Sequence, residues 1–226
     1  MPPKNPWEKI SRKNTIADCD RSLVQPYLIG LSKRIVNQQI HNELLPEPFL
    51  GNLNANVYLL NGNPGYSPQD SLATNDSLFE SEIQKTLKQN SGTAPTSFLW
   101  LDSAFRFYPG AIWWRKKLNQ VLKIKSNPKI CVVEYFPYHT ENLPKLISLP
   151  SNNYLDWYIN DAIDKKKNIV IMRCASEWIA RIPKLSNYNY FMCSNTRNVS
   201  ITEGNLLYKN GRLISHSDWI NLIKAM

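Results

Sequence analysis

A short apolar run that ends in a turn rich in glycine and proline constrains the fold of this chain more than any other segment. Residues 57–60 (Val-Tyr-Leu-Leu) have the length and apolar character of a buried strand, and residues 61–66 (Asn-Gly-Asn-Pro-Gly-Tyr) follow as a turn. Pro64 disfavours the helical region for the residue before it, so Asn63 is expected on extended backbone at the carboxyl end of the strand. In open α/β sheets, ligands bind at that end. An ordinary strand-to-helix turn has the same composition, and this alternative stays open.

Apolar runs and helical patterns alternate along the rest of the chain. Three more strands are predicted, at residues 130–136, 169–172 and 190–193. Helices are predicted over residues 21–41 with a disturbance at Pro26, 77–89 with Asn75 or Asp76 as the N-cap, 111–123, 154–165, 176–182 and from about Ser217, the last preceded by a hairpin around residues 210–211. Strands that alternate with helices form mainly parallel sheets covered on both faces. We therefore expect an α/β fold of three layers, α/β/α, around a central, mainly parallel four-stranded sheet.

The length of 226 residues and the hydrophobic content of 42% suit one domain with a substantial core. Residues 1–18 are polar and rich in proline, so we expect a flexible N-terminal arm, followed by a single α/β domain over residues 19–226. No apolar run approaches the length of a membrane span, and the amino terminus lacks the apolar core of a signal peptide. These features predict a cytoplasmic protein with no membrane association, and we expect a monomer.

The charge and the aromatic content favour a nucleic-acid partner. A formal net charge of +9 is combined with 11% aromatic residues, a pairing expected of proteins that bind a phosphate backbone and stack on bases. Basic proteins that never bind nucleic acids are also common, so composition leaves both classes open. The four cysteines are far apart in the sequence, and the three histidines show no metal-ligand spacing. We therefore expect neither a metal nor a cofactor.

If the four predicted strands are parallel, the loops that follow them meet at one edge of the sheet. These loops comprise residues 61–66, 137–142, 173–176 and 194–200. They carry the polar or aromatic side chains of Asn63, Tyr66, His139, Thr140, Asn142, Arg173, Asn195, Arg197, Asn198 and Ser200. Because the loops hold no carboxylate pair, no Cys/His dyad and no phosphate-loop lysine, a hydrolase triad and a P-loop are poor interpretations.

The turn at residues 61–65 resembles the first motif of the uracil-DNA glycosylase superfamily, in the form Gly-x-Asn-Pro-Gly of the mismatch-specific and single-strand-selective members. Residues 46–52 (Pro-Glu-Pro-Phe-Leu-Gly-Asn) are similar to the usual approach to that strand. The sequence differs from the motifs of the family at two places. Asn61 replaces the first glycine of the motif. Residues 194–200 lie where the family has its second motif, usually His-Pro-Ser-Pro or Asn-Pro-Ser-Gly, and only Asn195 matches it there.

The resemblance implies the fold of that superfamily and a DNA glycosylase, which flips a base out of DNA, hydrolyses its N-glycosidic bond and leaves an abasic site. The base is expected to be a uracil-like or modified pyrimidine, such as the hydroxymethylated or glucosylated bases of some phage DNA. The setting is then base-excision repair or antiphage defence.

Roles for individual residues follow from the same resemblance and from the chemistry of the bond. Asn63 is expected to orient the attacking water. His139, with Asn195 and Arg197 as alternatives, is expected to donate a hydrogen bond to the leaving base. The expected base-binding residues are Gly62, Pro64, Gly65, Tyr66, Asn142 and Asn195, with Phe105, Phe107 and Tyr108 as alternatives to Tyr66 for the pocket wall. The expected DNA-binding residues are Arg173, Arg197, Asn198 and Ser200.

Two other functions fit the same loops. A nucleic-acid-binding protein without catalytic activity would bind DNA in a salt-sensitive way and produce no alkali-labile sites. A nucleoside or nucleotide hydrolase would act on free nucleosides and have no affinity for DNA.

Overall fold

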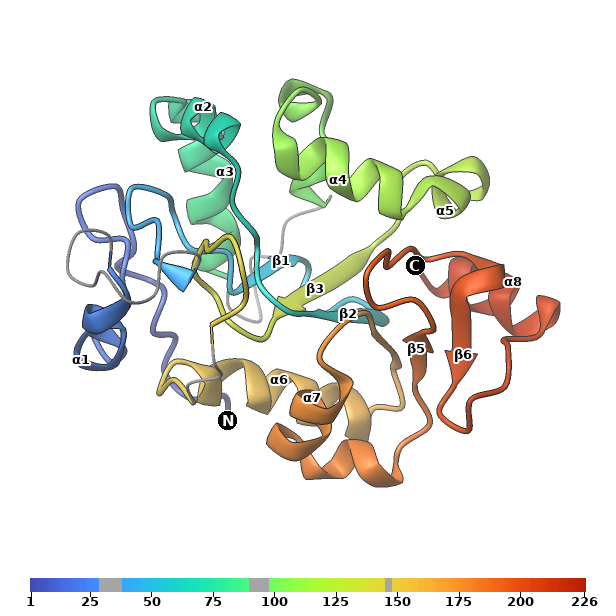
Figure 1. Cartoon of the computed structure of the whole chain (residues 1–226). Coiled ribbons are helices and arrows are strands. Elements are labelled where there is room, and N and C mark those ends of the chain that lie inside the picture. The colour runs from blue at the N-terminus through green and yellow to red at the C-terminus, as the bar shows by residue number, and fades with distance from the viewer. Residues whose placement is uncertain (29–37, 90–97, 145–147) are drawn as a thin grey trace.

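The computed structural model describes residues 1–28, 38–89, 98–144 and 148–226, which surround one mixed β-sheet (Figure 1). The sheet has the strand order β1-β3-β2-β4-β5-β6 in this part of the chain. The strands are β1 (Phe49–Gly51), β2 (Val57–Asn61), β3 (Ile130–Glu134), β4 (Asn168–Ile171), β5 (Phe191–Cys193) and β6 (Leu206–Tyr208). Strands β3, β2, β4 and β5 are parallel to one another, whereas β1 and β6 are antiparallel to their neighbours.

The α/β class is confirmed, but the expectation of a four-stranded sheet is wrong. The four predicted strands form its parallel centre, and β1 and β6 extend it at either edge. Each of these edge strands is only three residues long, which is too short to give a clear periodic pattern in the sequence. Every residue of β2 and of β3 is buried, as expected for parallel strands covered on both faces.

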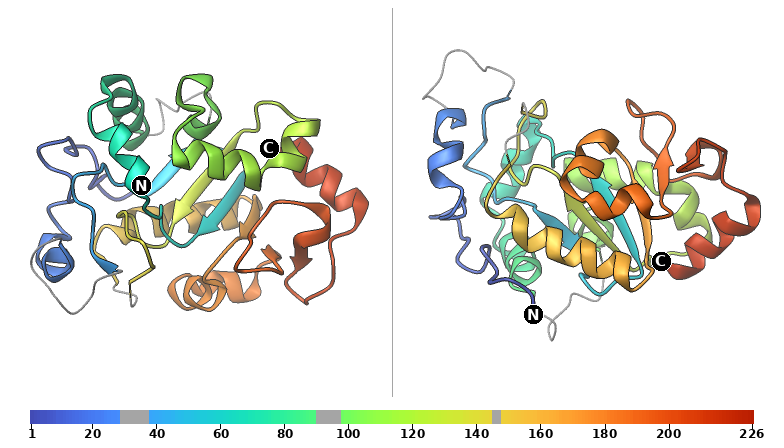
Figure 2. Two further views of the ribbon diagram at one scale, coloured as in Figure 1. Left: turned by 45° about the horizontal axis from the view of Figure 1, so that its top comes forward. Right: turned by 90° about the horizontal axis from the view of Figure 1, so that it is seen from below.

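Helices cover both faces of the sheet (Figure 1 and Figure 2). On one side lie α3 (Ser77–Leu87), α4 (Pro109–Lys117) and α5 (Asn119–Ile124), and on the other lie α6 (Asn152–Asp164) and α7 (Ala175–Arg181). The short helix α2 (Ser71–Thr74) precedes α3, and α8 (His216–Ala225) closes the chain beside β6. The predicted cap of α3 is confirmed, because Asp76 accepts hydrogen bonds from the backbone N–H groups of residues 78 and 79.

Two predicted helices differ from the observed ones. Of the helix expected over residues 21–41, the described residues contain α1 (Arg21–Val24) and a 3₁₀ turn over Gln25–Tyr27, which ends because Leu28 adopts an extended conformation. Residues 29–37 of that prediction lie outside the described residues. The helix expected over residues 111–123 is divided at Leu118 into α4 and α5.

The amino-terminal segment belongs to the folded core. Trp7, Ile10 and Ile16 are buried in the main hydrophobic cluster. The side chain of Asn5 donates a hydrogen bond to the backbone carbonyl of Leu87 at 2.7 Å. The expected flexible arm over residues 1–18 is therefore wrong for the stretch from residue 5 to residue 17. Its apolar residues are widely and irregularly spaced, so no periodic pattern marks them as core residues.

Replacement of Trp7 by alanine should destabilise the protein by about 3 kcal/mol or more, because it removes a large aromatic side chain from the core. The Trp7 side chain is 1% exposed and lies edge-on to Tyr138, with ring centroids 6.1 Å apart. Phe107→Ala is the matched control, since Phe107 is 72% exposed, and should change the free energy of unfolding by at most about 0.5 kcal/mol. Urea unfolding measures both changes. Equal stabilities of the two variants would contradict the placement of Trp7 in the core.

Candidate functional site

The carboxyl ends of the central strands surround a cavity. Strand β2 is the first parallel strand in the chain and lies between β3 and β4, so the strand order changes direction beside it. Ligands of open α/β sheets bind in the crevice at such a point. Asn61 ends β2, Glu134 ends β3 and Arg173 follows β4. All three line a cavity of about 210 Å³, together with the turn after β2.

The segment after β2 contains a glycine in the left-handed region. Gly65 has a φ angle of +79°, a region that glycine enters without strain. The backbone N–H of Phe136 donates to the carbonyl of Gly62 at 2.8 Å, which ties the turn to the segment after β3. Asn63, Pro64, Gly65 and Tyr66 all line the cavity.

The side-chain amide of Asn63 is held in one orientation. Its Nδ2 donates to the backbone carbonyl of Thr140 at 3.0 Å and to the Thr140 hydroxyl at 2.9 Å. Both amide hydrogens are therefore directed at one residue, and Asn63 is buried. Within the described part of the chain, no donor pairs with Oδ1 of Asn63. This carbonyl oxygen can accept a hydrogen bond from a water molecule and so fix the direction of the water's lone pair.

His139 lies beside Thr140 and holds the other end of the same turn. Its Nδ1 is 2.9 Å from the backbone carbonyl of Gly65, and its Nε2 is 3.1 Å from that of Leu45. Burial lowers the pKa of His139, while the charge of Asp70 and the two carbonyls act in the opposite direction. Because both ring nitrogens face backbone carbonyls, a role for His139 as donor to a leaving base stays a prediction and would require the ring to move.

Two buried carboxyl groups line the cavity, and the expectation of an edge without a carboxylate pair is wrong. Glu134 Oε1 accepts a hydrogen bond from Asn61 Nδ2 at 3.0 Å. Burial raises the pKa of Glu134 to about 8. Neither Glu134 Oε2 nor Asn61 Oδ1 has a hydrogen-bond partner among the described residues, although both atoms are buried. Such unpaired buried polar atoms are rare, and both of these can pair with a ligand.

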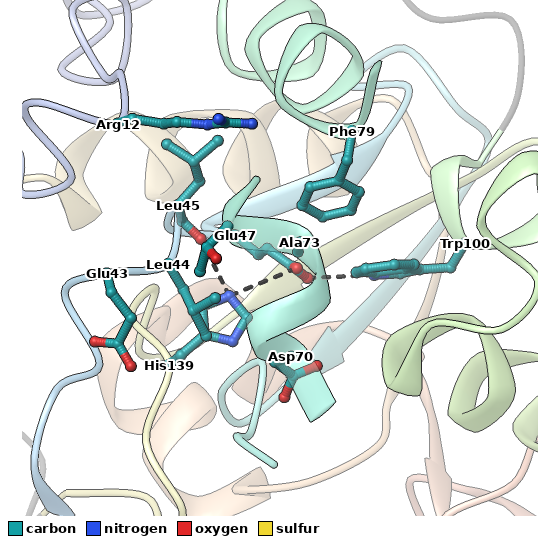
Figure 3. A pocket seen from close by; sticks show the side chains of 11 residues that line it. Arg12, Glu43, Leu44, Leu45, Glu47, Asp70, Ala73, Phe79, Trp100 and His139 are labelled. Carbon is teal, nitrogen blue, oxygen red and sulfur yellow. Dashed lines mark hydrogen bonds and ion pairs between the residues drawn. The ribbon is translucent and has the colours of Figure 1, made fainter. Parts of the chain in front are cut away.

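The second carboxyl group belongs to Glu47, just before β1. Its Oε2 accepts a hydrogen bond from Trp100 Nε1 at 3.3 Å, and its Oε1 lies 3.6 Å from Nε2 of His139 (Figure 3). Burial raises the pKa of Glu47 well above its ordinary value. Glu47 and His139 also border a smaller void of about 20 Å³, which is large enough for one water molecule.

Tryptophans form most of the aromatic wall. Trp100, Trp113 and Trp114 line the cavity with Tyr66, whose ring stacks on His41 with centroids 3.2 Å apart. A side chain at Gly110 would lie 2.6 Å from the Trp100 ring, so α4 can approach this indole closely only because residue 110 is glycine. The alternatives Phe105, Phe107 and Tyr108 do not line the cavity, and Phe105 is buried in the core instead.

The loop after β5 lies outside the cavity wall. Asn195 is exposed, and its Oδ1 accepts hydrogen bonds from the backbone N–H groups of Arg197 and Asn198 at 3.1 and 2.9 Å. Asn198 accepts a hydrogen bond from Lys117 at 2.8 Å, and the carbonyl of Ser200 accepts one from Asn205. Asn142, from the loop after β3, is also exposed and does not line the cavity. These positions do not support the predicted contacts of Asn142 and Asn195 with a base.

Arg173 lies nearer to the cavity than the sequence predicts. It was expected to contact the DNA backbone, yet it lines the cavity, with its guanidinium carbon 5.9 Å from the centre of the Trp113 ring. Its positive charge acts to lower the pKa of Glu134, against the larger effect of burial. Gly62 lies at the base of the turn, where a side chain would contact Cys174.

The sequence held a signal for one of the missed residues. Glu134 is the one charged residue in an otherwise apolar and aromatic run, residues 130–136, and an acidic group in a buried strand marks a candidate site. Glu47 and the tryptophans carried no such signal, because segments distant in the sequence bring them together.

In the described residues, no group of three or more His, Cys, Asp or Glu side chains is arranged to hold a metal ion. No helix described there is both long enough and apolar enough to cross a membrane. The chain matches no protein-family model, and neither a curated protein nor a solved structure matches it. Function is therefore inferred from the chemistry of the cavity.

Glu134→Gln should change how the free energy of unfolding depends on pH. The folded protein keeps the Glu134 proton up to about pH 8, whereas the unfolded chain loses it near the ordinary value of 4.5. The stability contributed by this proton is fully present at low pH and is lost as the pH rises through that window.

Between about pH 5 and about pH 9, the wild type should therefore lose on the order of a few kcal/mol more stability than the glutamine variant. Urea unfolding of both proteins at the two pH values measures the difference. Parallel pH dependences would show that Glu134 ionises normally in the folded state.

Proposed function

We propose that this protein is a monomeric, cytoplasmic DNA glycosylase, which hydrolyses the N-glycosidic bond of a pyrimidine flipped out of DNA and leaves an abasic site. The single observation that carries this proposal is the state of Asn63. Its amide is fixed by Thr140, and its Oδ1 has no partner among the described residues at the wall of an aromatic cavity. The resemblance of residues 61–65 to the first motif of the uracil-DNA glycosylase superfamily supports the same function. A three-layer fold of that superfamily's type fits the helices on both faces of the sheet.

The bond needs a positioned water more than a strong base. As the base leaves C1′, the sugar gains oxocarbenium-like charge, and a water already aimed at C1′ can attack it. An amide oxygen cannot remove the water's proton usefully at neutral pH, but it can accept a hydrogen bond and hold the water in place. Asn63 Oδ1 is suited to this, because both hydrogens of its amide are occupied by Thr140.

The cavity wall suits a flat, polar-edged ring. Tyr66, Trp100 and Trp113 offer aromatic faces, on which a base can stack. In the part of the chain that the structure describes, Asn61 Oδ1 and Glu134 Oε2 lack partners, and a buried unpaired polar atom costs roughly 1–3 kcal/mol. With its pKa raised to about 8, Glu134 is a hydrogen-bond donor at neutral pH, while Asn61 Oδ1 accepts. Neighbouring donor and acceptor groups match the pairing edge of a pyrimidine.

The leaving base departs with the electron pair of the broken bond. Arg173 is a permanently charged group at the cavity wall, so it can stabilise the developing negative charge. The exposed Arg197 and the net charge of +9 provide long-range attraction for the phosphate backbone.

The function is tested on DNA panels that carry uracil, mismatches, hydroxymethylcytosine or glucosylated hydroxymethylcytosine, with mass spectrometry of the released bases. We expect release of a modified pyrimidine in preference to uracil. Residues 194–200, which stand in the place of the second motif, do not line the cavity, whereas Glu134 does. Rapid release of uracil without action on phage-type bases would overturn that preference. No base release from any DNA, together with hydrolysis of free nucleosides, would overturn the glycosylase assignment.

Asn63→Ala should lower the rate of base release by about a hundredfold or more, because water orientation acts on the transition state. Affinity for DNA should stay within about threefold of the wild type, since the phosphate contacts are unchanged. Asn195→Ala is the matched control, because Asn195 is exposed and lies outside the cavity, and it should retain nearly full activity. Single-turnover kinetics and binding titrations measure the two quantities. An active Asn63→Ala variant would remove the basis of the proposed site.

A further inference from the structure

Glu47 and His139 form a buried pair that neither positions the water nor binds the base in the proposed mechanism. Both side chains are deeply buried, with Glu47 4% and His139 8% exposed. They lie between the main cavity and the small void, and both border each of these spaces. Figure 3 shows one nitrogen of the imidazole directed at both the Leu45 carbonyl and the Glu47 carboxyl group, which in turn is directed towards Trp100.

The hydrogen-bond geometry of the imidazole favours its charged form, although burial lowers the pKa of His139. A neutral imidazole carries one N–H group, so one of its two nitrogens would place a lone pair against a carbonyl oxygen. The distances of 2.9 Å to Gly65 O and 3.1 Å to Leu45 O are both those of hydrogen bonds. Only the imidazolium donates to both carbonyls.

A buried imidazolium needs a negative partner, and Glu47 is placed to supply it. Glu47 Oε1 lies 3.6 Å from Nε2 of His139. Other charged or titratable groups also face the pair: Arg12, His41, Glu43, Asp70 and Glu134. Asp70 is bound to the backbone and hydroxyl of Ser67, and Glu43 is bound to His41, so these two carboxylates have partners of their own. Glu134 is bound to Asn61.

Burial opposes the charge on both groups, and pairing favours it. Burial raises the pKa of Glu47 well above its ordinary value. It also lowers the pKa of His139, although the charge of Asp70 and the two carbonyls act to raise it, so burial favours the neutral form of each group. The two groups share one exchangeable proton. When this proton lies on His139, both ring nitrogens donate hydrogen bonds to the two backbone carbonyls. Glu47 is then a carboxylate, which can accept a proton during a reaction.

We infer that Glu47 and His139 form a carboxylate–imidazolium pair, and that Glu47 accepts the proton of the water held by Asn63. This inference rests on the proposed glycosylase function. Two contacts link the pair to the turn that carries Asn63. His139 binds the carbonyl of Gly65, and its neighbour Thr140 binds the amide of Asn63. Glu47 and Asn63 line the same cavity.

The reaction step balances without a further reactant. The water oxygen forms a bond to C1′, the bond from C1′ to the base nitrogen breaks, and its electron pair leaves with the base. One proton of the water passes to Glu47, which is then neutral beside the His139 imidazolium. Release of this proton to solvent restores the pair, and no oxidant, reductant or metal takes part.

The protonation of His139 is tested first, without any substrate. The chain has three histidines, so the side-chain ¹⁵N resonances of the labelled full-length protein are few enough to assign by comparison with histidine variants. We expect both nitrogens of His139 to be protonated at about pH 7, and Glu47→Gln to return the ring to its neutral form. Glutamine has nearly the same volume as glutamate, and its oxygen can still accept the hydrogen bond from Trp100 Nε1. A neutral His139 in the wild type, or no change in Glu47→Gln, would overturn the pair.

The proton transfer is tested by single-turnover rates across pH, on the DNA from which the wild type releases a base. The wild-type rate should fall at acid pH as Glu47 takes up a proton, and Glu47→Gln should be about 10²- to 10⁴-fold slower with that acid limb lost. Glu47→Asp should keep the limb, which separates lost acidity from a packing defect. Glu43 borders the same small void, and the control variant Glu43→Gln should behave like the wild type.

The outcomes separate this inference from the proposed function. A wild type that releases base normally, with a Glu47→Gln variant that is equally fast or keeps its acid limb, would overturn the inference alone. A wild type with a protonated His139 that releases no base from any DNA would show that the proposed function is wrong although the pair exists.

Discussion

Two adjacent residues, His139 and Thr140, hold the turn after β2, and the rest of the site depends on this contact. Thr140 receives both hydrogens of the Asn63 amide, and His139 binds the carbonyl of Gly65 two residues later. The contact is possible because β2 and β3 are neighbours, with Asn61 opposite Glu134 at their ends. The register of two buried parallel strands thus sets the orientation of one amide at the cavity wall.

Polar groups buried at the cavity give the site its chemical character. Asn61, Glu47, Glu134 and His139 stand at the end of a sheet whose interior is otherwise apolar. Charges and hydrogen bonds act more strongly there than in water, because few solvent molecules compete with them. The same burial makes unpaired oxygens costly, so a ligand that pairs with them gains affinity as well as selectivity.

The sequence was informative about local patterns and uninformative about distant contacts. The run at residues 57–60, the turn with Asn63 and the cap at Asp76 follow from neighbouring residues, and the structure contains all three. Trp7 and Glu47 reach their positions through contacts far along the chain, which no local pattern records. The prediction that the loop after β5 contributes to the cavity is wrong for a geometric reason. β4 separates β5 from β2, so this loop starts about 10 Å from the turn although both follow parallel strands.

The most direct measurement is a crystal structure of the protein bound to DNA in which the target nucleotide carries a 2′-fluorine that slows bond cleavage. If the cavity is the active site, the flipped base lies against the aromatic wall, its pairing edge meets Asn61 and Glu134, and a water bound to Asn63 Oδ1 faces C1′. A base that stays stacked in the duplex, or one bound elsewhere on the protein, would contradict the site.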